Sequence, residues 1–387
     1  MDVLRGISRL FGLGRRVEMD RPSVSRGPVD HVVILDGTMS TLDVGRETNA
    51  GIIYKLLCEA RRREGARVSI KYEAGIQWRG FLHMVDVIAG IGIDEQIRRA
   101  YGFIASRYRP GDRIMLFGYS RGAFAVRSLA GFINACGLLR PEAATERNIA
   151  ILYRHYQGDP ESPGARAFRA RHCHEAVEIE FVGVFDTVKA LGIRMPLLWR
   201  ICPVEHEFHD HQLGPHIRHG AHALALDETR LAYEPVLWRT DHANGRIVQM
   251  WFRGSHADVG GQIGDFAAAR PLSNIPLVWM LERAEACGLP LPRGWRERFP
   301  RDSRAPAVGT WRGLGRLFLA RRRRVALADP SEHLHPSAGG RFKARLARLP
   351  SADMAATVCA GDEKGNDRAD VAAADVGEAG IEVPARG

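Results

Sequence analysis

The chain has 387 residues, of which 45% are hydrophobic, so it can bury one large core or two modest ones and is expected to be globular. Its formal net charge of +10 comes mostly from arginine and suits anionic partners such as phospholipid headgroups, but no aromatic-and-basic nucleic-acid-binding motif accompanies it. No run of about 18 apolar residues predicts a membrane span, and the six cysteines, with no C-x-x-C pair, predict neither a disulfide framework nor a cysteine-rich zinc module.

Residues 1–29 carry apolar side chains at helical spacing, interleaved with arginines, and predict a basic amphipathic segment. The segment lacks the continuous apolar stretch of a secretory signal peptide. We therefore expect a cytoplasmic protein, or one exported by a route that needs no signal peptide. A helix docked on the body or a frayed terminus is the favoured interpretation, and contact with a membrane surface is the alternative.

Strand-like and helix-like segments alternate through the next 270 or so residues, a pattern typical of an α/β fold. In chain order we predict strand 31–36, helix 47–64, strand 68–72, helix 94–108, strand 114–117, helix 123–133, a mainly helical insertion over 141–171, strand 177–186, helix 223–230, strand 247–252 and helix 272–287. This order predicts an α/β-hydrolase-like fold, with a mostly parallel sheet, helices on both faces and helical insertions.

The strongest motif is Gly118-x-Ser120-x-Gly122, which stands between an apolar strand and a helix. A serine in such a sharp strand-to-helix turn tolerates only glycine two residues to either side, and its hydroxyl is exposed at the carboxyl edge of the sheet. We predict Ser120 as a nucleophile. The helix begins with Arg121, whose backbone N–H is predicted to stabilise an oxyanion.

Three further segments can contribute to the same edge. The turn Gly37-Thr38 after the first strand is predicted to supply the second oxyanion donor, and an ordinary strand-ending turn is the alternative. Asp186 ends a later strand, and His256 follows the next, so that serine, acid and histidine occur in the order expected of α/β-hydrolases. We predict Asp186 as the orienting acid and His256 as the general base.

Each of these assignments has an alternative from the same residues. Asp186 could cap its strand, and His256 could be a packed histidine with no chemistry. Asp258, two residues beyond His256, is predicted to hold the loop, with a role as the orienting acid as the less favoured interpretation.

The rest of the chain carries weaker signals. Segment 195–199 is apolar and predicts a lid or the wall of an acyl pocket. The six histidines that follow it, between 206 and 222, fit no metal-binding spacing, so we predict no metal and no cofactor. We divide the chain into a catalytic domain over 30–300, an arginine-rich extension over 301–350 and a disordered tail over 351–387. For the run Arg321–Arg324 a solvated face is the favoured interpretation, and contact with phosphate is the alternative.

Several of these segments together resemble a known family. They include Leu35-Asp-Gly-Thr38, Phe117-Gly-Tyr-Ser-Arg-Gly-Ala123, Phe181-Val-Gly-Val-Phe-Asp-Thr-Val188 and Trp251-Phe-Arg-Gly-Ser-His-Ala-Asp-Val-Gly-Gly261. In this order they resemble an uncharacterised α/β-hydrolase domain family related to the Tle-type phospholipase effectors of type VI secretion, over about residues 30 to 290. The resemblance implies the same roles for Ser120, Asp186 and His256.

The resemblance also implies a substrate and partners. Known members cleave acyl esters of glycerophospholipids, and several are delivered as antibacterial toxins. We therefore expect a serine hydrolase that acts on lipid acyl esters, with a secretion carrier or an immunity protein as further partners and no nucleic acid. The alternatives are an esterase or thioesterase for small soluble substrates, and a hydrolase-like scaffold that binds a partner without turnover.

Overall fold

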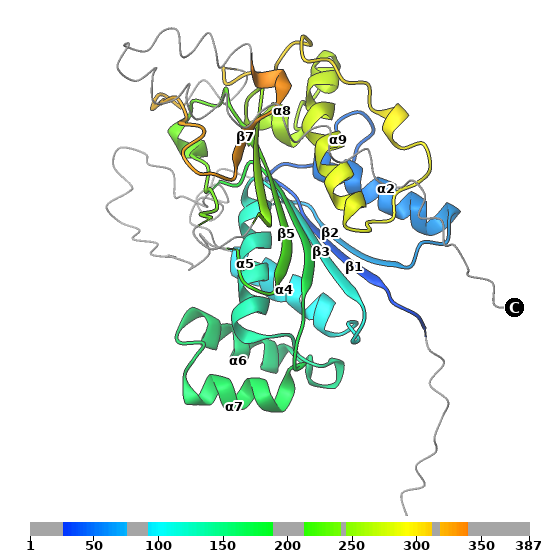
Figure 1. Cartoon of the computed structure of the whole chain (residues 1–387), viewed down its shortest axis with the longest axis vertical. Helices are drawn as coiled ribbons and strands as arrows, with labels where there is room; N and C mark the ends of the chain where they lie inside the picture. The colour runs from blue at the N-terminus through cyan, green and yellow to red at the C-terminus, as the bar shows by residue number, and fades with distance from the viewer. Residues whose placement is uncertain (1–25, 76–91, 189–212, 241–244, 312–317, 340–387) are drawn as a thin grey trace, which may run out of the picture.

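The computed structural model describes residues 26–75, 92–188, 213–240, 245–311 and 318–339 (Figure 1). Most of the predicted N-terminal segment, the apolar segment 195–199, the first three histidines of segment 206–222 and the predicted tail over 351–387 lie outside these ranges. Among the helices that the structure describes, none combines the length and apolar character needed to cross a bilayer.

The described chain is built on a seven-stranded sheet with the order β2-β1-β3-β4-β5-β6-β7. All six pairs of neighbouring strands are parallel. The strands are β1 (Asp30–Leu35), β2 (Val68–Glu73), β3 (Arg113–Tyr119), β4 (Ile179–Phe185), β5 (Ile217–Ala225), β6 (Ile247–Phe252) and β7 (Glu332–Leu334). Because the strands are parallel, their carboxyl ends lie along one edge, where chain segments far apart in sequence meet.

Helices cover both faces of the sheet. They are α2 (Asn49–Arg63), α4 (Ile93–Ala105), α5 (Arg121–Cys136), α6 (Glu146–Gln157), α7 (Pro163–His172), α8 (His256–Gly260) and α9 (Arg270–Ala286). Figure 1 shows α4, α5, α6 and α7 on one side of the sheet and α2, α8 and α9 on the other. The predicted α/β-hydrolase-like fold is confirmed.

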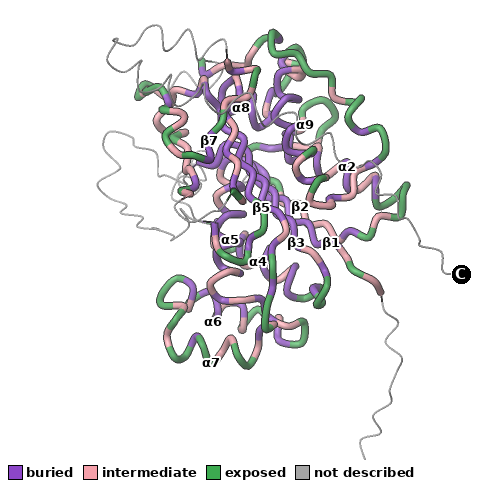
Figure 2. Tube along the Cα trace, in the orientation of Figure 1, coloured by how far each residue is buried: buried purple, intermediate pink, exposed green. Residues whose placement is uncertain are grey.

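Strand β1 shows why both faces are covered. Val33 and Leu35 pack into the core beneath α4 and α5, whereas Val32 and Ile34 pack into the core beneath α2 and α9. Side chains along a strand alternate between the faces, so a continuous apolar strand needs a cover on each. Figure 2 accordingly shows the central strands buried and α7, on the outside, largely exposed.

Two elements differ from the sequence-based expectation. The predicted helix over 223–230 is wrong, because Ala223 to Ala225 end strand β5, which is hydrogen-bonded between β4 and β6. The alternating Ala-Leu pattern favours a helix, but pairing on both sides outweighs that propensity. The short strand β7 comes from the predicted arginine-rich extension and pairs with β6. The domain boundaries themselves stay predictions.

Candidate active site

Ser120 lies at the turn from β3 into α5 and has the backbone angles φ 58° and ψ −121°, a strained conformation for a residue with a side chain. The flanking glycines are required by close backbone contacts. An ideal Cβ on Gly122 would lie 2.1 Å from the Leu35 carbonyl oxygen, and one on Gly118 would lie 2.6 Å from Ala123 Cα. The motif therefore forms a sharp, tightly packed turn from β3 into α5, with Ser120 at the carboxyl end of β3.

The structure brings together the three residues predicted from separate segments. His256 Nε2 lies 2.8 Å from Ser120 Oγ, and His256 Nδ1 lies 2.6 Å from Asp186 Oδ2. In the neutral imidazole, Nδ1–H donates to the carboxylate and Nε2 accepts from the hydroxyl. The exposed fractions of Ser120, His256 and Asp186 are 7%, 3% and 0%, so little water competes for these hydrogen bonds.

His256 is held in place from several directions. It is the first residue of the short helix α8, which is closed by a capping box between Ser255 and Asp258. Its backbone N–H donates to Glu228 at 3.2 Å, and the rings of Tyr119 and Tyr233 lie 4.9 and 4.7 Å from the imidazole centroid. His256 thus begins a helix, whereas the sequence predicted a loop at this position.

The carboxylate that contacts the His256 imidazole is that of Asp186, and Asp258 has other partners. Its Oδ2 accepts from the backbone N–H and the hydroxyl of Ser255, at 2.8 and 2.7 Å, and its Oδ1 accepts from Val308 N–H at 2.6 Å. These bonds hold the start of α8, which is the role that the sequence favoured for this residue.

Asp186 follows β4 and has a positive φ of 42°. Besides His256, its carboxylate accepts from Ala225 N–H at 3.0 Å and from both terminal nitrogens of Arg324, at 2.5 and 3.0 Å. Burial raises the pKa of this carboxyl, but the charge of Arg324 and the hydrogen bond to His256 outweigh it and hold the pKa well below its ordinary value. Asp186 is therefore a carboxylate at neutral pH.

Arg324 is the residue at this site that sequence reasoning missed. The run Arg321–Arg324 was expected to be a solvated face, and for Arg324 this is wrong, because its residue exposure is only 8%. An arginine within a run of four gives no local signal of burial. The contact arises because the chain after residue 318 returns to the sheet and continues into β7.

The predicted oxyanion turn lies beside the serine, since an ideal Cβ on Gly37 would be 3.4 Å from Ser120 Cβ. However, the N–H of Gly37 donates to the side chain of Asp36 at 2.7 Å, which favours the other two predicted donors. Thr38 and Arg121 remain as the candidates. Their side chains are hydrogen-bonded to each other, which ties the turn to the first residue of α5.

A second buried histidine, His222, contacts the backbone next to Asp186. His222 Nε2 accepts from Thr187 N–H at 3.1 Å, directly after Asp186, and His222 Nδ1 lies 3.3 Å from Gln249 Oε1. Burial, with a further contribution from the nearby Arg127, lowers the pKa of His222 to about 3. His222 is therefore neutral near pH 7 and fixes the backbone that carries the acid.

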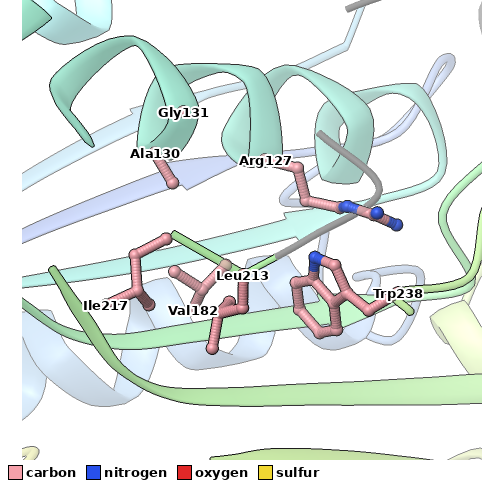
Figure 3. A pocket seen from close by; sticks show the side chains of 7 residues that line it. All are labelled: Arg127, Ala130, Gly131, Val182, Leu213, Ile217 and Trp238. Atoms are coloured by element: carbon pink, nitrogen blue, oxygen red, sulfur yellow. The ribbon is translucent and has the colours of Figure 1, made fainter. Parts of the chain in front are cut away.

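Figure 3 shows the small cavity on this side of the sheet, where Arg127 of α5 reaches over Trp238. The guanidinium carbon lies 4.7 Å from the Trp238 ring centroid. The cavity has a volume of about 10 Å³, which is room for a single water molecule. It is too small for an acyl chain, and the segment predicted to line an acyl pocket, 195–199, lies outside the described residues.

Comparison with known proteins supplies the family. The sequence model described as "T6SS, Phospholipase effector Tle1-like, catalytic domain" matches residues 30–283, about two thirds of the chain. The chain belongs to the Tle1-like phospholipase effector family. The resemblance stated from the motifs alone is thereby confirmed, and β7 and Arg324 lie beyond the matched residues.

Individual relatives are more distant. The uncharacterized protein YEL023C of Saccharomyces cerevisiae is 29% identical over 251 residues, covering 59% of this chain and 35% of that protein. Among solved structures, an uncharacterized protein from Pseudomonas aeruginosa is 16% identical with a TM-score of 0.38, covering 71% of this chain and 49% of its own. The Tle1 effector bound to the VgrG spike of the type 6 secretion system is 19% identical with a TM-score of 0.33, and the match covers 61% of this chain and 51% of the effector chain. The chain thus spans about a third to a half of these proteins.

Among the described residues, one trio of side chains has metal-ligand character. Potential ligand atoms of Glu180, His219 and Cys287 lie within 4.8 Å of one another. The first two stand in the amino-terminal halves of β4 and β5, away from the edge that carries the serine. Arg218 lies 3.8 Å from Glu180 and competes for its carboxylate. This trio is remote from the chemistry proposed below.

Proposed function

We propose that this Tle1-like protein is a serine hydrolase that cleaves acyl ester bonds of lipids, glycerophospholipids in particular, through Ser120, His256 and Asp186. The observation that carries the proposal is the pair of distances at His256, 2.8 Å to the serine hydroxyl and 2.6 Å to the aspartate. A serine in this setting is an activated nucleophile. The family match supports lipid esters as the substrate class.

In the proposed mechanism, Ser120 Oγ attacks the ester carbonyl carbon while its proton passes to His256 Nε2. Asp186 accepts the hydrogen bond from Nδ1–H throughout and stabilises the imidazolium. The oxyanion is stabilised by the backbone N–H groups at Thr38 and Arg121. Collapse of the tetrahedral intermediate breaks the ester C–O bond, and the imidazolium protonates the leaving alcohol. Water, deprotonated by His256, then hydrolyses the acyl-enzyme and releases a fatty acid.

A cavity next to the acid supports a substrate that carries a negative charge as well as apolar groups. It has a volume of about 190 Å³ and is lined by four arginines, one glutamate and four apolar residues: Arg230, Leu231, Glu234, Pro235, Leu237, Arg322, Arg323, Arg324 and Val325. Arg324 lines this cavity and also contacts Asp186, so the arginine-rich lining lies next to the proposed catalytic residues. Arginine is well suited to bind a phosphodiester, which here competes with the carboxylates of Glu228 and Glu234 for Arg230 and Arg322.

The test is product analysis by mass spectrometry after incubation with vesicles of mixed phospholipids. Wild type is expected to release fatty acid and lysophospholipid in equal amounts, and Ser120→Ala to release neither. Cleavage of short p-nitrophenyl esters without any release from vesicles would contradict the lipid substrate and favour a small soluble ester. Inactivity of a folded wild type on both would favour the scaffold without turnover.

We also propose delivery by a secretion carrier through a route that needs no signal peptide, and inhibition by an immunity protein. Membership of a family of type VI secretion effectors supports both. Loss of export when the secretion apparatus of the host cell is deleted is the expected result. Unchanged export in that deletion would contradict the proposal.

A further inference from the structure

Arg324 contacts the proposed catalytic acid more extensively than His256 does. Its guanidinium donates to both carboxylate oxygens of Asp186, at 2.5 Å to Oδ1 and 3.0 Å to Oδ2. The Arg324 and Asp186 side chains have exposures of only 5% and 0%. Two donors in one plane facing two acceptors fix the orientation of a carboxylate as well as its charge.

We propose that Arg324 is a positioning residue, which keeps the Asp186 carboxylate ionised and oriented toward His256. The segment after residue 300 thereby completes the active site. This inference rests on the proposed function. The family match ends at residue 283, so neither the family nor the sequence motifs assign this role. Arg324 touches the acid and not the reacting atoms, so it acts through Asp186.

The hydrogen bonds around the acid support a role in orientation. Oδ1 accepts from Ala225 N–H and from Arg324, and Oδ2 accepts from His256 and from Arg324. Arg324 in turn donates to the carbonyl oxygens of Ala225 and Tyr233. Ala225 ends β5, and the Tyr233 ring packs against the imidazole. One side chain therefore joins the acid, the strand beside it and the residue that packs on the base.

The charge has a separate consequence. Activity requires Asp186 of the His256–Asp186 pair as a carboxylate, because the His256 Nδ1–H donates to it. A buried cation in contact with this carboxylate lowers its pKa. Removing the cation must therefore raise the pH below which the carboxylate is lost, and an opposite charge at this distance is worth about 1 to 3 pH units.

Other groups near the pair do not replace this charge. The titratable and charged groups that face it in the described structure are Arg324, His222, Tyr119, Tyr233, Glu228 and Arg230. His222 and Tyr119 are neutral near pH 7, because burial lowers the pKa of the first and raises the pKa of the second. Glu228 and Arg230 form an ion pair with each other at 2.7 Å, which leaves Arg324 as the cation bound to the acid.

The experiment measures the rate at which a fluorophosphonate labels Ser120 as a function of pH, because labelling needs an activated serine but no lipid. We expect Arg324→Gln to shift the pH of half-maximal labelling upward by about 1 to 3 units, with a smaller loss of rate on the high-pH plateau. Arg324→Lys keeps the charge and should shift it far less. Arg218→Gln is the matched control, since Arg218 is exposed, pairs with Glu178 and stands at the amino-terminal end of β5, so no shift is expected.

Three results would overturn the inference in distinguishable ways. If Arg324→Gln labels more slowly at every pH by the same factor, Arg324 has a structural role only. If wild type is never labelled, the proposed function fails together with the inference. If Arg324→Gln does not fold, Arg324→Gln/Asp186→Asn, which removes both charges, is expected to restore a folded chain by circular dichroism. Failure of this double variant to fold would mean that Arg324 acts through contacts other than the acid.

Discussion

Gly122→Ala tests whether the strand beside the elbow is as tightly packed as the structure shows. The added Cβ would lie 2.1 Å from the Leu35 carbonyl oxygen and 2.5 Å from the Leu35 carbonyl carbon. Carbon and oxygen atoms approach to about 3.3 Å, so β1 and α5 would have to separate by about 1.2 Å. β1 is hydrogen-bonded to β2 on one side and β3 on the other, so it cannot move without disturbing both pairings.

Overpacking against mobile side chains lowers the free energy of unfolding by about 1 to 3 kcal/mol. Here the atoms in contact belong to the backbone on both sides and cannot rotate away, so Gly122→Ala should cost about 3 kcal/mol or more. With a urea m value of about 3 kcal/mol/M, the unfolding midpoint should fall by about 1 M. The same shift moves the Gly37-Thr38 turn away from Ser120, so fluorophosphonate labelling should slow as well.

Gly164→Ala is the matched control. Gly164 is the second residue of α7, as Gly122 is of α5, but an ideal Cβ there would meet only His155 Cε1, at 3.8 Å. Alanine at this helical position should be neutral or stabilising by up to about 1 kcal/mol. Equal urea midpoints for the two variants would refute the reasoning.

Three further predictions concern other residues. The pKa of His222 is about 3 in the folded chain and about 6.5 in the unfolded chain. The free energy of unfolding should therefore fall as pH decreases from 6.5 toward 3, by at most about 1.4 kcal/mol per pH unit from this residue. His222→Gln should flatten that slope in urea titrations. Ser120→Gly should be about 1 kcal/mol more stable than Ser120→Ala, because only glycine relieves the positive φ of 58°; equal melting temperatures would contradict this. Glu228→Ala should cost about 3 to 5 kcal/mol by leaving Arg230, whose side chain is only 10% exposed, without its carboxylate. Glu234→Ala, from an exposed pair, should cost less than about 1 kcal/mol in the same assay.

The parts of the site that could be predicted from the sequence are those that follow buried strands. Ser120, Asp186 and His256 each come after an apolar run, and the carboxyl ends of parallel strands share one edge, so the topology alone brings them close together. The fold class follows from the same alternation of strands and helices. The hydrogen-bond geometry of these three residues could not be predicted, because it depends on where α8 begins and on the positive φ angles of Ser120 and Asp186.

The errors have a common physical cause, which is that tertiary contacts outweigh local pattern. Residues 223–225 resemble a helix but pair between two strands. Arg324 resembles a solvated arginine but lies against a carboxylate 138 positions earlier in the chain. In each case the deciding partner is a specific group whose position the local pattern does not encode.

Activation of the Ser120 hydroxyl by His256 can be measured as covalent labelling. The experiment is intact-mass measurement after treatment with a fluorophosphonate, followed by peptide mapping. We expect one adduct per chain, located on Ser120, with no adduct on Ser120→Ala and labelling slowed by several orders of magnitude on His256→Ala. A folded wild-type protein that carries no adduct, or one that carries it on another residue, would show that Ser120 is not activated.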